Sequence, residues 1–261
     1  PFGEDGTVQG LLELADVPYV GAGVLASAVG MDKAVMKVLF RSHGLAVSDW
    51  VVVRAGEWRA RRAAVAAEVA ERLALPVFVK PANAGSSVGI SKVKAWDRLE
   101  AAVDLAAGFD VKIVVEQAVP RAREIEVAVL GNEVPEASVP GEIVPAGEFY
   151  DYEAKYLNEG SALHIPAPLD EATTAEMRRQ ALVAYQAVEG AGMARVDFLV
   201  DRETGEVFLN EVNTIPGFTT ISMYPKLWAA SGLAYPALLD RLIALALDRH
   251  GARQALRTSA Q

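Results

Sequence analysis

The stretch that decides the fold is RVDFLVDRETGEVFLNEVN, residues 195–213, followed directly by TIPGF at 214–218. Two apolar runs flank a short polar turn, which predicts a β-hairpin. Because side chains alternate between the two faces of a strand, Arg195 and Asp197 share one face. Glu211 and Asn213 likewise share one face of the partner strand. The hairpin therefore gathers charged groups on an otherwise apolar element.

Two registers of this hairpin are compatible with the pattern. In one, Arg195 lies opposite Glu211. A slip by two residues puts Asp197 opposite Glu211 and moves Arg195 opposite Asn213. Either register places all four polar groups on the same face, where direct and diagonal neighbours are roughly 5–8 Å apart.

Two carboxylates and an amide oxygen held this close repel one another unless a cation lies between them. A few oxygen ligands suit Mg²⁺, which keeps waters and takes further ligands from phosphates. The alternative is a solvated face with an ordinary Arg–Glu pair. The Gly/Pro-containing loop at 214–219, directly after the carboxylates, favours a functional site.

A second candidate site follows the buried strand expected at 76–80, which ends on Lys80. The loop at 81–89 contains Gly85, Ser86, Ser87 and Gly89, whose backbone amides and hydroxyls are able to wrap a phosphate. It is neither a Walker A loop nor a Rossmann fingerprint. An ordinary β-turn with capping serines is the alternative interpretation of this loop. Lys33, taken by itself, is interpreted as a surface lysine.

The remaining pattern predicts an α+β chain without internal repeats. The loop from about 140 to 168 is long and irregular, which is typical of a lid or of a disordered segment. A domain boundary is expected near Glu116. Helices are expected at 8–14, 32–43, 57–73, 96–107, 170–189 and 235–247, and further strands at 51–53, 90–94, 113–116 and 124–129.

Composition narrows the function. The 261 residues are 52% hydrophobic and carry a net charge of −9, so a large core is expected and a general nucleic-acid binder is not. The absence of cysteine excludes disulfides, thiol catalysis and Cys-ligated metals. No apolar run approaches the ~18–20 residues of a membrane helix. The three histidines are not spaced as metal ligands. The sequence has no Gly-x-Ser-x-Gly nucleophile elbow, which disfavours a hydrolase triad.

The combination of motifs resembles the D-alanine–D-alanine ligases of the ATP-grasp superfamily. The matching segments keep one order along the whole chain, and their joint occurrence is specific although each alone is not. They are GEDGTVQG at 3–10, MDK at 31–33, VKP at 79–81, GSSVG at 85–89, FYDYEAKY at 149–156, RVD at 195–197 and EVNTIPG at 211–217.

The resemblance implies the ATP-grasp fold, with two α+β lobes holding a nucleotide between them. It divides the chain into a remnant of an N-terminal substrate domain at 1–30, a central lobe at 31–115, and a C-terminal lobe at 116–261 that carries the lid. The chain begins at Pro1 rather than Met, and family members have a longer N-terminal domain. We therefore expect a truncated chain, for which an ATP/Mg-binding module with little turnover is the alternative to an active ligase.

The activity implied by the resemblance is ATP-dependent ligation of two D-alanines through an acyl phosphate, which supplies peptidoglycan synthesis in the cytoplasm. The resemblance implies ATP and two Mg²⁺ ions, for which Mn²⁺ is able to substitute. It is compatible with a homodimer. No nucleic-acid or membrane partner is expected. The implied metal ligands are Asp197, Glu211 and Asn213.

The remaining implied roles divide between nucleotide and substrate. Arg195 and the Gly217 amide stabilise the tetrahedral oxyanion, while Ser222, with Tyr156 and Arg195, binds substrate. Ser86 and Tyr156 join the network that closes the lid, and the EAKY pattern ending at Tyr156 favours an amine nucleophile. The implied ATP-binding residues are Lys33, Lys80, Glu116, Gln117, Ala118, Val119, Glu124 and Lys155.

Overall fold

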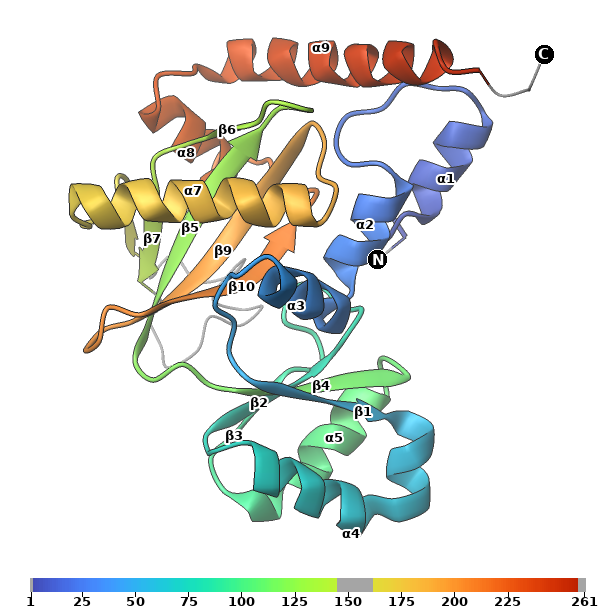
Figure 1. Cartoon of the computed structure of the whole chain (residues 1–261), viewed down its shortest axis with the longest axis vertical. Coiled ribbons are helices and arrows are strands. Elements are labelled where there is room, and N and C mark those ends of the chain that lie inside the picture. Colours follow the sequence, from blue (N-terminus) through green and yellow to red (C-terminus); the bar gives the residue numbers. More distant parts are fainter. Residues whose placement is uncertain (1, 145–161, 258–261) are drawn as a thin grey trace.

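The computed structural model describes residues 2–144 and 162–257. It contains two antiparallel sheets, one above the other along the long axis, with helices packed on both (Figure 1). The mixed order of helices and strands confirms the predicted α+β class. Lys155, Tyr156 and most of the predicted lid lie outside the described residues.

The smaller sheet has the strand order β1-β4-β2-β3, and two helices cover it. Its core joins apolar residues of all four strands to Trp58 and Val103 of those helices. The elements are β1 (Trp50–Arg54), α4 (Ala55–Arg72), β2 (Val77–Pro81), β3 (Ser91–Val93), a 3₁₀ turn (Trp96–Arg98), α5 (Leu99–Ala107) and β4 (Lys112–Gln117).

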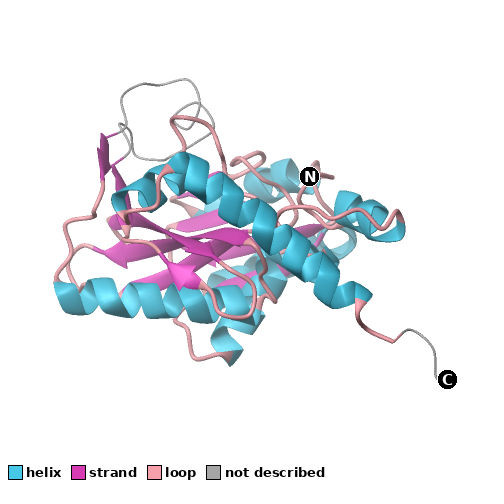
Figure 2. Cartoon of the chain, turned by 90° about the horizontal axis from the view of Figure 1, so that it is seen from above, coloured by secondary structure: helices cyan, strands magenta, loops and turns pink. Residues whose placement is uncertain are grey.

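The larger sheet has the order β10-β9-β5-β7-β8, with β6 beside β5. Helix α7 packs on one face, and α8 packs on the other (Figure 1). Seen from above, α9 crosses the molecule and leads to the C-terminus (Figure 2). The elements are β5 (Ala122–Leu130), β6 (Glu136–Ala137), β7 (Gly141–Val144), β8 (Ala162–His164), α7 (Glu171–Ala187), β9 (Met193–Asp201), β10 (Val207–Asn213), α8 (Met223–Ala230) and α9 (Tyr235–Gln254).

Three N-terminal helices complete the fold: α1 (Thr7–Leu14), α2 (Val24–Met31) and α3 (Lys33–Ser42). Helix α3 touches both sheets. Its Met36 and Phe40 lie in the core of the larger sheet, while the Lys33 amide donates to the carbonyl of Ala82 beside the smaller one. Because α3 spans this junction, its polar side chains reach the space where the two sheets meet.

The predicted helix ends follow local chemistry. The Asp32 carboxylate accepts hydrogen bonds from the amides of Ala34 and Val35, which caps α3, and Asp170 caps α7 through the Thr173 amide. Gly44, just beyond α3, has a φ of 75°, which is a conformation that glycine adopts without strain.

Several element predictions are wrong in detail. The stretch 140–168, predicted as irregular, forms β7 at its start and contains β8 near its end, and these strands pair with each other. The segments that form α2 and α8 were not predicted as helices. The helix predicted at 96–107 begins with a separate 3₁₀ turn.

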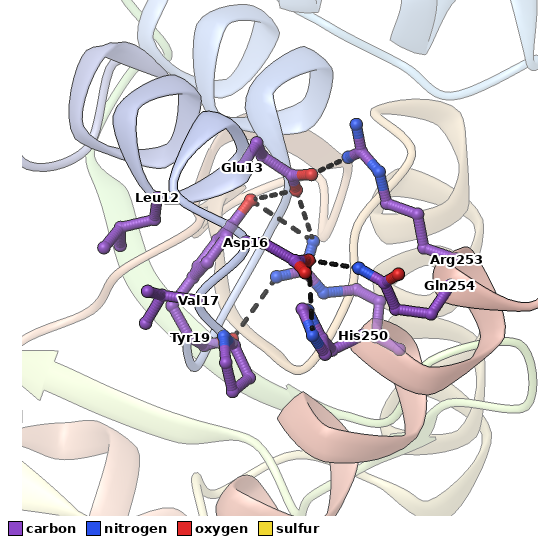
Figure 3. A pocket seen from close by; sticks show the side chains of 10 residues that line it. Leu12, Glu13, Asp16, Val17, Tyr19, His250, Arg253 and Gln254 are labelled. Carbon is purple, nitrogen blue, oxygen red and sulfur yellow. Dashed lines mark hydrogen bonds and ion pairs between the residues drawn. The ribbon is translucent and has the colours of Figure 1, made fainter. Parts of the chain in front are cut away.

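Helix α9 continues beyond residue 247, where the predicted helix ends, because its last turns are held by charge rather than by apolar packing. Arg253 pairs with Glu13 of α1 (Figure 3). Arg249 also pairs with Glu13, and its Cζ lies 4.3 Å from the Tyr19 ring centroid. The Tyr19 hydroxyl donates to Glu13 at 2.7 Å. These contacts surround a cavity of about 270 Å³ and tie the N-terminal segment to the C-terminal helix.

Among the described residues, no single helix has the length and apolar composition to cross a membrane. The bent pair α8 and α9, at 107°, meets that test only when the two helices are taken together.

Candidate active site

The β9–β10 hairpin adopts the second of the two predicted registers at its polar end. Asp197 lies opposite Glu211, and Arg195 lies opposite Asn213. Near the turn the pairing is offset, with Val200 opposite Val207, and a register shift between Leu209 and Glu211 corrects it. This irregularity has the form of a β-bulge, which re-aims side chains at functional sites. It brings the two acidic side chains face to face.

Arg195 is the centre of this polar face. Its Nε and Nη2 atoms donate to the two carboxylate oxygens of Asp197, each at 2.7 Å, which forms a bidentate pair. Asn213 Nδ2 donates to the same carboxylate at 2.9 Å. Burial alone would lower the pKa of Arg195, but the charges of nearby carboxylates, Asp197 first, raise it well above its ordinary value. The guanidinium therefore stays charged.

Strand β5 adds a residue that the sequence interpretation missed. Glu126 pairs with Asp197 across β5 and β9, and its Oε2 lies 3.1 Å from Arg195 Nε. The alternation along 124–129 predicted that Glu124 and Glu126 share a face, but not which strand lies beside them. Glu124 lies on the same strand, opposite Leu199 and Ile143.

The side chains of this face offer oxygen atoms, which are the kind of donor that a divalent cation takes. The carboxylates of Glu126, Asp197 and Glu211 gather around the guanidinium of Arg195. The Asn213 amide adds an oxygen, so the ligands are all of the hard type that Mg²⁺ takes. Within residues 2–144 and 162–257, no group of three or more Asp, Glu, His or Cys side chains is arranged so that it could hold a metal ion.

A second cluster, the buried ion cluster of Lys37, Glu116 and Lys80, lies where α3, β4 and β2 meet. Lys37 Nζ lies 2.7 Å from Glu116 Oε1, and Lys80 Nζ lies 2.6 Å from Oε2. The Ser48 hydroxyl also donates to Glu116. Burial would raise the pKa of Glu116, but the charges of Lys37 and Lys80 together hold it far below its ordinary range. The carboxylate is therefore ionised.

The residues predicted to surround adenine lie at the end of β4. The Glu116 side chain is turned into the buried ion cluster, and the Gln117 side chain accepts from the Ala74 amide at 3.1 Å. The backbone amides of Gln117 and Ala118 donate to Asp49 and Pro76. Val119, the next residue, is half-buried.

The glycine-containing loop lies beside Lys33. Lys33 Nζ donates to the Ala84 carbonyl at 2.7 Å, which links α3 to the loop. Ser86 and Ser87 have φ values of 52° and 59°, in the left-handed region that non-glycine residues occupy at a cost of roughly 1–3 kcal/mol. Ser86 is exposed, and such strained backbone clusters at ligand sites.

The loop after β10 brings Gly217 and Ser222 together. A Cβ atom added at Gly217 would lie 2.9 Å from Ser222 Oγ, so only glycine fits there without displacing the serine. Ser222 Oγ accepts from the Thr219 amide at 3.0 Å and lies at the start of α8.

Sequence reasoning missed Lys37 and Ser48 as well as Glu126. Lys37 lies one helical turn after Lys33, a spacing that offered a weak signal for a shared face. Ser48 offered none, because its partner Glu116 is 68 residues away in the chain.

Comparison with known proteins supports this arrangement. Residues 39–244 match the family model described as "D-ala D-ala ligase C-terminus". The chain is 56% identical over 254 residues to a D-alanine–D-alanine ligase of Heliobacterium modesticaldum, and the match covers 97% of the chain and 69% of that protein.

Solved structures give the same result. The D-alanine–D-alanine ligase from Coxiella burnetii superposes with a TM-score of 0.81 at 42% identity, covering 97% of this chain and 67% of that one. The VanG D-Ala:D-Ser ligase from Enterococcus faecalis gives 0.84 at 38% identity, covering 94% and 69%.

The two sheets and the clusters between them thus define an ATP-grasp protein. More narrowly, the chain belongs to the D-alanine–D-alanine ligase family.

Proposed function

We propose that the chain catalyses the ATP-dependent joining of two D-alanines into D-alanyl-D-alanine, the dipeptide of peptidoglycan precursors. The observation that carries the proposal is the charged face of β5, β9 and β10, where Arg195 is bonded to Asp197 beside two further carboxylates. A strong family match accompanies this chemistry along nearly the whole chain.

The reaction has two steps. A carboxylate oxygen of the first D-alanine attacks the γ-phosphorus of ATP, and ADP leaves with the bridging oxygen. The amine of the second D-alanine then attacks the acyl carbon, a proton is lost, and inorganic phosphate departs with the transferred oxygen. Such chemistry depends on positioning and on neutralising charge more than on covalent help from the protein.

The lysines and Arg195 supply the positive charge for these steps. Lys80 carries the ammonium of the buried ion cluster that is nearer to solvent, with its side chain 13% exposed, and Lys33 holds the loop at Ala84. We assign both to phosphate binding. Arg195, already oriented by Asp197, is assigned with the Gly217 amide to the oxyanion of the tetrahedral intermediate.

Asp197, Glu211 and Asn213 would hold the divalent cations. Two Mg²⁺ ions, replaceable by Mn²⁺, supply charge neutralisation on the ATP phosphates when they are bound. The carboxylates gathered on the β5–β9–β10 face support this assignment, and Glu126 adds a further carboxylate beside Asp197.

The remaining assignments rest on the family. Ser222 is proposed to bind the second substrate's carboxylate, and Ser86 to join the closing network with Tyr156. Glu116, Gln117, Ala118 and Val119 are assigned to the adenine end and Glu124 to the ribose, with Lys155 on phosphate. The three-part division at residues 30 and 115, a cytoplasmic location and a homodimer are proposed on the same basis.

The test is release of phosphate from Mg-ATP with and without D-alanine. Phosphate release that requires D-alanine, with the dipeptide as product, is the expected result. Binding of Mg-ATP without D-alanine-dependent release would favour the alternative, a nucleotide-binding module with little turnover. Failure to bind Mg-ATP in calorimetry would contradict both functions.

A further inference from the structure

Lys37 is a charged side chain in a place where charge is costly. It lies on α3 with its side chain 2% exposed, and burial lowers its pKa. An ammonium removed from water needs a charged partner and hydrogen bonds to remain ionised. The family-derived site residues do not include it, so its retention in the interior needs a reason.

The hydrogen bonds of Lys37 link it through Glu116 to Lys80. Its Nζ donates to Glu116 Oε1 at 2.7 Å and to the Ser48 hydroxyl at 3.2 Å. The other oxygen of the same carboxylate lies 2.6 Å from Lys80 Nζ. One carboxylate therefore bridges two ammonium groups that come from different elements.

The charges of this cluster do not balance. In the described part of the chain, Glu116 is the only carboxylate within 4.0 Å of either ammonium, so one positive charge remains. Lys37 is sealed inside, whereas the Lys80 side chain is 13% exposed. The surplus charge is therefore available to an anion at Lys80 and not at Lys37.

We propose that Lys37 is a positioning residue for nucleotide binding: it neutralises Glu116, so that Lys80 is oriented by that carboxylate without being neutralised by it. A pair of Lys80 and Glu116 alone would have no net charge and would attract phosphate weakly. This inference rests on the proposed function, in which Lys80 contacts the ATP phosphates.

Three variants separate this role from simple packing. Lys37→Met leaves a neutral Lys80–Glu116 pair and keeps the buried volume. The double variant Lys37→Met/Glu116→Gln removes both buried charges, so the single charge of Lys80 is restored. Arg179→Met, on α7, is the matched control because it removes one positive charge that is exposed and paired with Glu176 rather than with a residue of the cluster.

The measurement is calorimetric binding of Mg-ATP, with adenosine as a competitor that lacks phosphates. We expect Lys37→Met to weaken Mg-ATP binding at least tenfold and to leave adenosine affinity within twofold. The double variant should restore the ratio of Mg-ATP affinity to adenosine affinity to within about threefold of the parent's ratio, because a loss of adenine contacts at Glu116 weakens both ligands alike. Arg179→Met should bind as the parent chain does.

Circular dichroism and thermal melting establish that each variant is folded at the temperature used. If Lys37→Met does not fold, the double variant still tests the proposal, because it leaves no unpaired buried charge. Equal losses for Mg-ATP and adenosine in Lys37→Met would overturn the positioning role, and so would a double variant whose ratio of Mg-ATP to adenosine affinity stays more than tenfold below that of the parent chain. So would parent-like binding by Lys37→Met.

Lys80→Met separates failure of this inference from failure of the proposed function. If Lys80→Met weakens Mg-ATP binding while Lys37→Met does not, only the inference fails. If the parent chain does not bind Mg-ATP, or Lys80→Met does not weaken its binding, the phosphate assignment itself is wrong.

Discussion

Glu116→Gln should destabilise the protein in a way that depends on pH. The substitution keeps the shape of the side chain but leaves Lys37, with a side chain only 2% exposed, without its counter-ion. Breaking a buried ion pair from one side costs about 3–5 kcal/mol. Since domains of this kind are stable by about 5–15 kcal/mol, the free energy of unfolding at about pH 7 should fall by a large fraction.

The pH dependence follows from Lys37. Burial already lowers its pKa, and loss of Glu116 lowers it further because the carboxylate's attraction disappears. As pH rises through the variant's lowered value, Lys37 loses its proton in the folded state and the penalty shrinks. The difference in free energy of unfolding between the variant and the parent chain should shrink by up to about 1.4 kcal/mol per pH unit. This continues until the pH reaches the pKa of Lys37 in the parent chain.

Urea unfolding followed by circular dichroism, at about pH 7 and about pH 9.5, measures this difference. The matched control is Glu142→Gln, which removes a buried carboxylate whose Oε1 lies 2.8 Å from Arg123 Nε. Arginine does not deprotonate in this range, so the control's deficit should stay constant. A Glu116→Gln deficit below about 1 kcal/mol, or one that does not narrow as pH rises, would refute the reasoning.

Three further outcomes are expected. Glu211→Gln should abolish the Mg²⁺-dependent part of nucleotide binding, and calorimetry that gives equal affinities with Mg²⁺ for variant and parent would contradict the metal assignment. Tyr224→Phe should lower the free energy of unfolding by about 1–3 kcal/mol, because the buried hydroxyl donates to the Val129 carbonyl at 2.9 Å; an unchanged urea midpoint would count against this. Gly30→Ala would place a Cβ 2.8 Å from Thr214 Cγ2, at the start of the loop at 214–219 that carries the proposed oxyanion group Gly217, so KM for D-alanine should rise while Mg-ATP affinity holds; the reverse pattern would show that this loop serves the nucleotide.

Local signals in the sequence predicted much of the fold. Asp32 and Asp170 mark helix starts because their carboxylates cap backbone amides, and Gly44 marks an end. The hairpin at 195–213 was predicted from two apolar runs around a polar turn, and the alternation of side chains placed its polar groups on one face.

What the sequence could not supply depends on distant partners. The register shift between Leu209 and Glu211 decides which of the two predicted registers forms at the polar end. The residue type at position 210, an asparagine, does not predict this shift. Helix α2 has apolar or small residues on all sides, so its sequence shows only a weak helical periodicity. It also lacks a side-chain cap that would mark its start. The pairing of Glu116 with Lys37 joins residues 79 positions apart, and only the meeting of α3 with β4 makes it visible.

The family motifs marked the ligand-binding candidates, but they did not describe how those residues are held. Arg195 is oriented by a bidentate pair with Asp197, two residues away on the same strand, together with Glu126 from the neighbouring strand. Strand order, which is a property of the whole sheet, decided that contact.

The central claim is that a D-alanine carboxylate becomes an acyl phosphate at this site. The most direct measurement uses D-alanine labelled with ¹⁸O in its carboxylate, Mg-ATP, and mass spectrometry of the products. If the account is correct, each dipeptide formed is accompanied by one inorganic phosphate carrying one ¹⁸O atom. Dipeptide formed with unlabelled phosphate would contradict it, because the transferred oxygen would then have come from water.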